Sequence, residues 1–395
     1  MSRAEVAVVG LGAIGSMTLW RLAERGIAVH GYERFGIAHD RGASAGQTRR
    51  FSVQSQREPR FTPLAVRALD LWRELADVSG RELFRQTGGV IIGPEGTPAL
   101  ASATASANEN ALPYEFLEAD ALRSRFPQHG VRDSDVGVTD PFAGYLRPEA
   151  SVASAVERAT SLGAEVSLYT EVLGVEPRAD GVAVVTTYGE ELYERVVLAP
   201  GAWAGELVPG AVVPRRLVQG WYLARRPEDY GPDVFGVFER VGDLSAYGFP
   251  TLDGATVKIG IKFEPHPVIP DLGNVQRSVD SDYAIRVAQV IPDFFPGLHP
   301  DPVSLQTGIE GYSPDDLPLV GLAPSDPRVV IACGFSGSGF KFAPVMGDIA
   351  ADFATTGSSS RDASFMAPAR DQLLRSTASN QSTANGRQRS SMSNS

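Results

Sequence analysis

Short apolar runs alternate with helical patterns at the start of the chain. Val6–Val9 is apolar throughout, which predicts a buried strand, and Ser16–Arg25 has a helical pattern that ends before a glycine. Ile27–Tyr32 predicts a second buried strand. Together the three segments predict a βαβ unit with a glycine-rich turn between its first strand and its helix.

Two longer helices and a hairpin are predicted further along. Pro63–Val78 and Pro148–Leu162 each begin with proline, carry apolar residues at helical spacing and are followed closely by glycine. The turn Ala179–Gly181 separates two alternating segments, which indicates a hairpin. Val196–Leu198 predicts another buried strand.

The pattern changes between Arg215 and Pro300, where short alternating segments with aromatic residues predict a mostly antiparallel sheet. Val329–Ala332 returns to the buried-strand pattern and leads into GFSGSGFKF, residues 334–342. The stretch Ser376–Ser395 is rich in Ser, Asn, Gln and Thr, so we expect it to be disordered.

Composition narrows the functional classes. A net charge of −11 argues against nucleic acid or an anionic membrane as the main partner. The single cysteine, Cys333, excludes an internal disulfide and a cysteine-rich metal site, which leads us to expect a cytoplasmic protein. No signal peptide and no apolar run long enough to cross a bilayer is recognised, and the five histidines are too scattered to indicate a metal site.

The stretch GLGAIG has the form G-x-G-x-x-G. Gly10 permits the tight turn, Gly12 lets the backbone approach a pyrophosphate, and Gly15 allows close packing of helix on strand. Glu33 ends the next strand, where its carboxylate can accept hydrogen bonds from an adenosine ribose. This turn alone fits NAD and FAD equally.

The second glycine-rich loop favours FAD. GFSGSGFKF follows a buried strand and precedes a helix, so its N–H groups can stabilise negative charge on a reduced flavin ring. An ordinary surface loop is the alternative, but it does not explain Phe340 and Phe342 on either side of Lys341 next to a buried strand.

Five stretches carry a resemblance to a known family. They are VAVVGLGAIG, GQTRRF at 46–51, VVLAPGAW at 196–203, YGFPTLDGATVKIG at 247–260 and VVIACGFSGSGFKFAP at 329–344. In this order they resemble the sarcosine oxidase and N-methyltryptophan oxidase group of FAD-dependent amine oxidases, within the D-amino acid oxidase superfamily. The resemblance covers roughly residues 6–365.

The resemblance implies an α/β fold, α+β overall, with a discontinuous Rossmann-like FAD domain and a mostly antiparallel substrate domain. The FAD domain is expected at 1–85, 145–215 and 302–370, and the substrate domain at 86–144 and 216–301. The tail 376–395 belongs to neither.

The resemblance also implies roles for five residues. Arg49 is similar to the arginine near the flavin ring, Lys258 to the lysine that activates oxygen, and Lys341 to the lysine that binds the substrate carboxylate. Tyr247 and Tyr312 match aromatic positions that face the substrate. From the residues alone, Lys258 could equally face solvent and Tyr247 could be part of the core.

The expected FAD contacts extend over both glycine-rich loops and the segments between them. They are Gly10, Gly12, Ala13, Ile14, Gly15, Glu33, Arg34, Ser44, Thr48, Arg49, Val172, Gly201, Trp203, Gly334, Ser336, Gly337, Gly339, Phe340 and Lys341.

The chain departs from the family pattern at the FAD attachment point. Glu310 stands where many relatives carry the cysteine that binds FAD covalently, and the segment ASAG before GQTRR lacks the histidine that others use. Cys333 is expected to be a core residue. We therefore predict non-covalent FAD.

Other departures lie on the substrate side. Ser52 replaces an arginine that pairs with the carboxylate-binding lysine; Arg50 is expected to point elsewhere, and Arg240 is a candidate replacement. Lys262 and Ser338 stand where relatives often carry histidine. These changes put N-methylglycine in doubt and favour a larger amine, or one without a free carboxylate.

The expected reaction is oxidation of the C–N bond of an N-methyl or cyclic amino acid-like secondary amine to an imine, with O2 reduced to H2O2. A monomer is expected. The alternatives are a dehydrogenase or biosynthetic tailoring oxidase acting on a larger amine, a flavin-bearing protein without turnover, and an NAD-dependent dehydrogenase.

Overall fold

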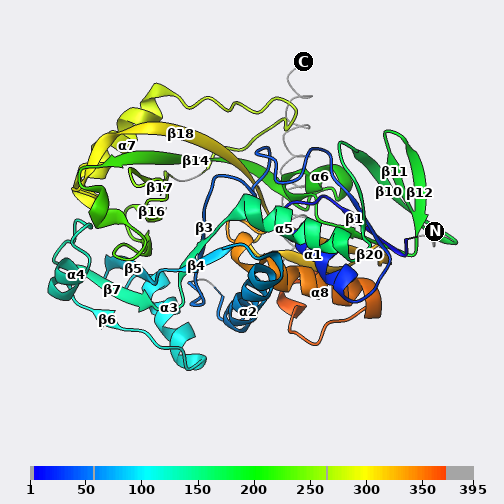
Figure 1. Cartoon of the computed structure of the whole chain (residues 1–395), viewed down its shortest axis with the longest axis horizontal. Helices are drawn as coiled ribbons and strands as arrows, with labels where there is room; N and C mark the ends of the chain where they lie inside the picture. Colours follow the sequence, from blue (N-terminus) through cyan, green and yellow to red (C-terminus); the bar gives the residue numbers. More distant parts are fainter. Residues whose placement is uncertain (1–3, 57, 264–265, 371–395) are drawn as a thin grey trace, which may run out of the picture.

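The computed structural model describes residues 4–56, 58–263 and 266–370. The predicted disordered tail, 376–395, lies outside the described residues. The described residues form two large sheets, one of six and one of eight strands. Figure 1 shows helices packed beside one sheet, and the long strands β14 (Val213–Ala224) and β18 (Leu298–Tyr312) of the other extending away from it.

The six-stranded sheet contains the predicted βαβ unit at its centre. Its strands are parallel apart from the antiparallel pair at one edge. In spatial order they are β19 (Leu319–Ala323), β20 (Asp326–Cys333), β13 (Arg195–Leu198), β1 (Val6–Val9), β2 (Val29–Tyr32) and β9 (Glu165–Ser167).

Both faces of this sheet are buried, which explains why its strands are apolar throughout. Val6 and Val8 face the core formed with the helices α1, α2, α5 and α8. Ala7 and Val9 face the opposite side, in a second core that includes residues of the β10–β12 sheet. These elements are α1 (Ala13–Glu24), α2 (Phe61–Ser79), α5 (Pro148–Ser161), α8 (Ala343–Thr356), β10 (Val172–Arg178), β11 (Gly181–Thr186) and β12 (Gly189–Tyr193).

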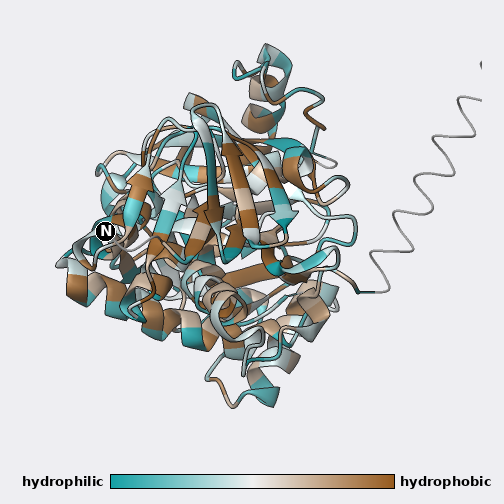
Figure 2. Ribbon diagram, turned by 90° about the vertical axis from the view of Figure 1, so that its right-hand side faces the viewer, coloured by the Kyte–Doolittle hydropathy of each residue, from teal (hydrophilic) through white to brown (hydrophobic). Residues whose placement is uncertain are grey.

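The eight-stranded sheet is antiparallel except where β15 pairs with β5. In spatial order its strands are β18 (Leu298–Tyr312), β14 (Val213–Ala224), β17 (Thr256–Lys262), β16 (Ser245–Gly248), β15 (Val237–Arg240), β5 (Gly89–Pro94), β7 (Asp135–Asp140) and β6 (Phe116–Leu117). Figure 2 shows that many strand segments inside the molecule are hydrophobic, whereas much of the outer loops is hydrophilic.

The remaining elements connect the two large sheets or cover their outer sides. They are the small sheet β3 (Arg49–Phe51), β8 (Gly144–Leu146) and β4 (Phe84–Gln86); the helices α3 (Pro98–Glu109), α4 (Ala119–Arg125), α6 (Ala204–Leu207) and α7 (Ser281–Phe294); and the 3-10 turns η1 (Gly201–Trp203), η2 (Pro227–Tyr230), η3 (Phe340–Phe342) and η4 (Ser364–Met366).

The predicted elements form, with bounds that differ by up to three residues, and further elements, among them the helices α3, α4 and α7, were not predicted. The first helix begins at Ala13, three residues before the predicted Ser16, because the turn itself enters the helix and the Ala13 N–H donates to Ser44 Oγ at 2.9 Å. The α7 helix was not predicted: its fully buried residues are only Val287 and Ile291, so its apolar stripe is narrow. The mixed fold class is confirmed. The division into an FAD domain and a substrate domain stays a prediction, and β18 extends across one of its proposed boundaries.

Candidate functional site

Gly10 and Gly15 give the first turn a shape that a side chain would disrupt. Gly10 has a φ of +86°, and a Cβ there would lie 2.7 Å from the Ala199 carbonyl oxygen. A Cβ on Gly15 would lie 1.7 Å from the Gly10 carbonyl oxygen, so α1 packs directly on the turn. A Cβ on Gly12 would meet no backbone atom, since within 4 Å it would contact only Ser44 Oγ, at 3.4 Å. The backbone at Gly12 can therefore approach a ligand closely.

Glu33 is held in place at the end of β2. One carboxylate oxygen accepts the Leu11 N–H at 2.8 Å, and the other accepts the Phe35 N–H at 2.9 Å and lies 3.4 Å from His39 Nε2. Burial alone would raise the pKa of this carboxyl, but the hydrogen bonds from His39, Phe35 and Leu11 outweigh it and lower the pKa. Glu33 is thus a fixed anion beside the turn.

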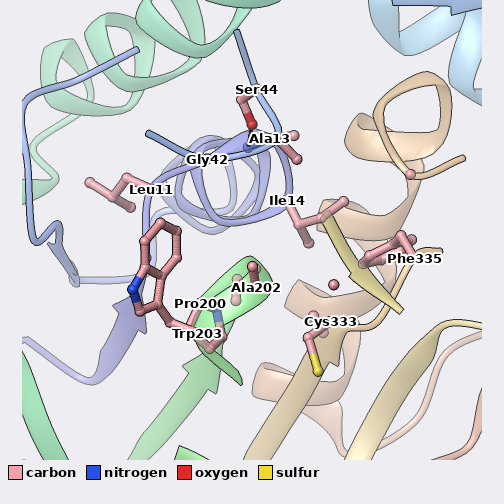
Figure 3. A pocket seen from close by; sticks show the side chains of 18 of the residues that line it. Leu11, Ala13, Ile14, Gly42, Ser44, Pro200, Ala202, Trp203, Cys333 and Phe335 are labelled. Atoms are coloured by element: carbon pink, nitrogen blue, oxygen red, sulfur yellow. Dashed lines mark hydrogen bonds between the residues drawn. The ribbon is translucent and has the colours of Figure 1, made fainter. Parts of the chain in front are cut away.

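A hollow extends from Glu33 to the second glycine-rich loop, and we call it the cofactor hollow. It encloses about 1370 Å³ of empty space, including its open mouth. Figure 3 shows Leu11 and Trp203 on one side, Phe335 and Cys333 on the other, and the start of α1 between them. Because both glycine-rich loops line this one hollow, it fits an elongated dinucleotide better than a compact ligand.

Most of the predicted FAD contacts line the cofactor hollow. They are Gly10, Gly12, Ala13, Ile14, Glu33, Arg34, Ser44, Arg49, Val172, Gly201, Trp203, Gly334, Ser336, Gly337, Gly339 and Phe340. Three others lie elsewhere: Gly15 packs against the turn, Thr48 accepts hydrogen bonds from Lys258, and Lys341 lines a second hollow.

The second loop is anchored to the end of β18. The Ser336 N–H donates to the Gly311 carbonyl at 3.2 Å, and Ser336 Oγ accepts the Ser313 N–H at 3.1 Å. Ser336 has a φ of +48° and Gly337 a φ of +84°. A Cβ on Gly337 would lie 3.1 Å from Glu310 Oε2, so glycine brings the loop backbone close to this carboxylate.

A second hollow, which we call the substrate hollow, meets the cofactor hollow at one seam. It encloses about 1300 Å³ of empty space, mouth included, between the second loop and the eight-stranded sheet. The residues that line both hollows are Arg49, Glu310, Ser336, Gly337 and Phe340. Of the five predicted catalytic residues, Arg49, Tyr247, Tyr312 and Lys341 line the substrate hollow.

Lys258 lies buried close to Arg49, which rules out the alternative of a solvent-facing residue. Its side chain reaches from β17 to the GQTRR segment, where Nζ donates to the Gly46 carbonyl and, at 3.1 Å, to the Thr48 carbonyl. Desolvation, followed by the neighbouring Arg49 charge, lowers the pKa of Lys258 well below its ordinary value of 10.5, while Glu149 opposes this.

Lysine is rare in this chain, and this rarity is a sequence signal for the site. Only three of the 36 basic residues are lysines, namely Lys258, Lys262 and Lys341. Two of them line the substrate hollow, and Lys258 lies beside Arg49. Lysine can change its protonation state when buried, whereas arginine stays charged, so selective use of lysine points to this region.

The carboxylate-binding region differs in detail from the expectation. Lys341 Nζ donates to Ser52 Oγ at 3.3 Å, so Ser52 contacts the lysine without adding a charge. Arg50 was expected to point elsewhere, but it lines the substrate hollow and pairs with Glu239. Arg240 does not replace the missing arginine: it is buried outside both hollows and pairs with Asp135 at 2.7 Å.

Tyr247 combines the two roles that the sequence left open, a core residue and a residue that faces the substrate. It is half-buried and packs against Phe249, yet it also lines the substrate hollow, where its hydroxyl accepts a hydrogen bond from Gln219 Nε2 at 2.7 Å. A Cβ on Gly260 would lie 2.4 Å from the tyrosine ring, so this glycine leaves room for the ring over the sheet.

Several lining residues were missed from the sequence. In the cofactor hollow they include Phe35, His39, Pro200 and Phe335, and in the substrate hollow Gln219, Glu239 and His266. A usable signal existed for Gln219, a polar residue among apolar ones in the second half of β14. Glu239 offered none, because its strand β15 holds two apolar and two charged residues.

Cys333 is buried among apolar residues, as expected, and also lines the cofactor hollow. Burial raises the pKa of its thiol to about 12, so it is a poor nucleophile near neutral pH. Among the residues that the structure describes, no group of three or more His, Cys, Asp or Glu could hold a metal ion. Within the same ranges, every helix is too short or too polar to cross a membrane.

Known proteins resemble the chain over nearly its whole length. The profile of the FAD dependent oxidoreductase family, DAO, matches residues 5–353. Monomeric sarcosine oxidase of Streptomyces avermitilis is 33% identical, over 93% of this chain and 97% of the relative. N-methyl-L-tryptophan oxidase of Yersinia pestis is 32% identical, over 93% of this chain and 99% of the relative.

The structure of a known protein also matches this chain. NikD, described as an unusual amino acid oxidase essential for nikkomycin biosynthesis, superposes with a TM-score of 0.79 at 26% identity, covering 92% of this chain and 97% of its own. The family resemblance is therefore confirmed. The chain belongs to the DAO family of FAD-dependent oxidoreductases and is related to sarcosine and N-methyltryptophan oxidases.

Proposed function

We propose that this protein oxidises the C–N bond of a secondary amine derived from an amino acid, either N-methylated or cyclic, to an imine. The observation that carries the proposal is the seam where the two hollows meet. Arg49 and the second glycine-rich loop border both hollows there, and Lys341 lies on the substrate side. A cofactor bound in the cofactor hollow and a substrate bound in the substrate hollow would therefore contact each other at this seam.

The reaction removes the C–H hydrogen from the carbon next to nitrogen together with two electrons, and the N–H proton is lost as the C=N bond forms; the two hydrogens leave as the two protons of H2O2, and water can hydrolyse the imine. FAD, when bound, accepts these electrons and passes them to O2, which becomes H2O2. The side chains and backbone of the protein contribute positive charges and N–H donors at fixed positions. Lys341 would hold a substrate carboxylate, Arg49 and the N–H groups of the second loop would face the seam, and Lys258 would supply positive charge behind Arg49.

The direct test is anaerobic mixing of the FAD-loaded protein with N-methyl and cyclic amino acids, in which loss of the visible absorption band of oxidised flavin reports reduction by the amine. Bleaching by at least one such amine, with H2O2 formed when air is admitted, is the expected result. If every N-methyl and cyclic amino acid in a broad panel leaves the band unchanged, the proposed reaction is wrong.

Lys341→Met should weaken the use of carboxylate-bearing amines. Loss of a charged hydrogen bond predicts a fall in kcat/KM of about 10- to 100-fold, mostly through KM. N-methylphenethylamine, which lacks the carboxylate of N-methylphenylalanine, is the matched control and should be oxidised equally by both proteins. An equal loss for both amines would contradict carboxylate binding by Lys341.

We further propose that FAD is held without a covalent bond. Glu310 lies at the seam in place of the attachment cysteine, and Cys333 has a raised thiol pKa. Acid precipitation should release all the flavin into the supernatant. Flavin that stays with the pellet would contradict this, and replacing Cys333 with serine would then show whether that thiol is the attachment point.

A biosynthetic tailoring oxidase or dehydrogenase is the second candidate. The departures at Ser52, Lys262 and Ser338 favour a substrate other than N-methylglycine, and NikD is described as acting in a biosynthesis. The speed of reoxidation by O2 distinguishes an oxidase from a dehydrogenase.

A monomeric state and a cytoplasmic location stay predictions. Light scattering of the purified protein tests the monomeric state.

A further inference from the structure

Glu239 places a carboxylate on the sheet side of the substrate hollow. It lies on β15 directly opposite Tyr247 on β16, so the two side chains share one face of the sheet. Both residues line the hollow, and the Glu239 side chain is 20% exposed. Gln219, Lys262 and Glu310 of the same sheet also line the hollow, so this wall can recognise polar groups.

The two oxygens of Glu239 have different surroundings. Oε2 accepts from Arg50 Nη2 and, at 2.8 Å, from Gln56 Nε2. Within residues 4–370, leaving aside the undescribed gaps, Oε1 accepts no hydrogen bond, and it is not among the fully buried atoms that lack a partner. Oε1 is therefore accessible from the hollow.

The carboxylate remains ionised. Burial alone would raise the pKa of Glu239, but the Arg50 charge and the Gln56 hydrogen bond, with smaller contributions from Lys262 and Lys341, lower it. An ionised oxygen covered by a hydrocarbon side chain would lose water without gaining a partner, so purely apolar ligands are disfavoured.

The surrounding charges decide which kind of donor suits Oε1. The cations that line the hollow are Arg49, Arg50, Lys262 and Lys341, against the anions Glu239, Glu310 and Asp316. Arg50 already neutralises Glu239, and Lys262 and Lys341 would repel a second cation. An uncharged N–H or O–H group avoids this repulsion and still pairs with Oε1.

We propose that Glu239 determines specificity by selecting amines whose side chain carries an uncharged N–H or O–H donor. This rests on the proposed amine oxidation, because it names the substrate class of the same site. Arg50 and Gln56 act as positioning residues that hold the carboxylate so that Oε1 faces the ligand.

The test uses near-isosteric pairs of N-methyl amino acids that differ in one donor. The pairs are the N-methyl derivatives of tyrosine and phenylalanine, threonine and valine, and asparagine and leucine. In the FAD-loaded wild type, at least one pair should show a kcat/KM for flavin reduction that is about 10- to 100-fold higher for the donor-bearing member. Glu239→Met should bring that ratio to within about threefold of one.

Glu228→Met is the matched control, because Glu228 is an exposed glutamate whose carboxylate pairs with Arg226 outside the hollow. It should leave the ratio unchanged. Binding of the corresponding ether acids, with oxygen in place of the amine nitrogen, is measured by calorimetry and reports recognition without turnover. The same donor preference is expected in their Kd values.

The outcomes separate the two proposals. Turnover of amines without donor preference in any pair, or a preference that survives Glu239→Met, overturns the role of Glu239 and leaves the proposed reaction intact. A donor preference in ether-acid binding that is lost in Glu239→Met, together with no flavin reduction by any amine, supports the recognition role and overturns the proposed reaction.

Discussion

Lys258→Met is expected to slow the reoxidation of reduced FAD by O2 by about 10²- to 10³-fold, the usual cost of removing a preorganised charge or donor. Transfer of the first electron to O2 creates negative charge, and Lys258 Nζ, held close to Arg49 by the Gly46 and Thr48 carbonyls, stabilises that charge when it is protonated. Anaerobic reduction by the amine should change little, because that step creates no superoxide.

The position of Lys258 explains why methionine should be tolerated structurally. The lysine is 3% exposed, and its Nζ lies 5.1 Å from the centre of the Phe249 ring and 5.4 Å from that of Trp221. An unbranched apolar side chain fits these surroundings and removes a desolvated charge. Stopped-flow mixing of the pre-reduced protein with oxygenated buffer measures the rate.

The reaction with O2 should also depend on pH through Lys258. Its pKa is lowered, so the ammonium is fully present only below that lowered pKa and is lost as pH rises through it. The rate of the reaction with O2 should therefore fall as pH rises, at a pH below the ordinary lysine pKa of 10.5. This fall in rate should be absent from the pH profile of Lys258→Met. Arg226→Met, at an exposed arginine, serves as the charge-removal control.

A reoxidation rate that is unchanged in Lys258→Met would exclude the lysine from oxygen activation. A rate that is slow in the wild type as well would favour the dehydrogenase alternative, in which another acceptor takes the electrons.

Gly15→Ala is expected to abolish FAD binding and to destabilise the fold by at least about 3 kcal/mol. The added Cβ would lie 1.7 Å from the Gly10 carbonyl oxygen and 3.4 Å from Ala199 Cβ, so α1 would have to move away from the turn. The start of α1 and Glu33 define one end of the cofactor hollow, and their separation would change. Flavin content and urea unfolding measure the two effects.

Gly205→Ala is the matched control. Gly205 lies in the helix α6, and the nearest atom to an added Cβ there is the Val212 carbonyl oxygen at 3.7 Å, an ordinary contact. This variant should keep its flavin and its stability to within about 1 kcal/mol. If Gly15→Ala binds FAD as tightly as the wild type does, the close packing of α1 on the turn is not required for the site.

The local pattern predicted the central elements because their sequence signals are strong and local. Val6–Val9 is apolar on both faces, as a parallel central strand must be, and the helix Phe61–Ser79 ends at a glycine with left-handed backbone conformation. The α7 helix escaped prediction because it buries little apolar surface, and the early start of α1 depends on Ser44, which is far away in the sequence.

For the site, the sequence determined the candidate residues: the two glycine-rich loops and Glu33 from their local pattern, and Arg49, Lys258 and Lys341 from the family resemblance. Only the tertiary structure decided how they meet. It buried Lys258 beside the GQTRR segment, placed Glu310 at the seam, and turned Arg50 and Glu239 toward each other across β3 and β15. The physical reason is that glycine spacing and residue type act locally, whereas burial, charge pairing and pKa depend on neighbours brought together by the fold.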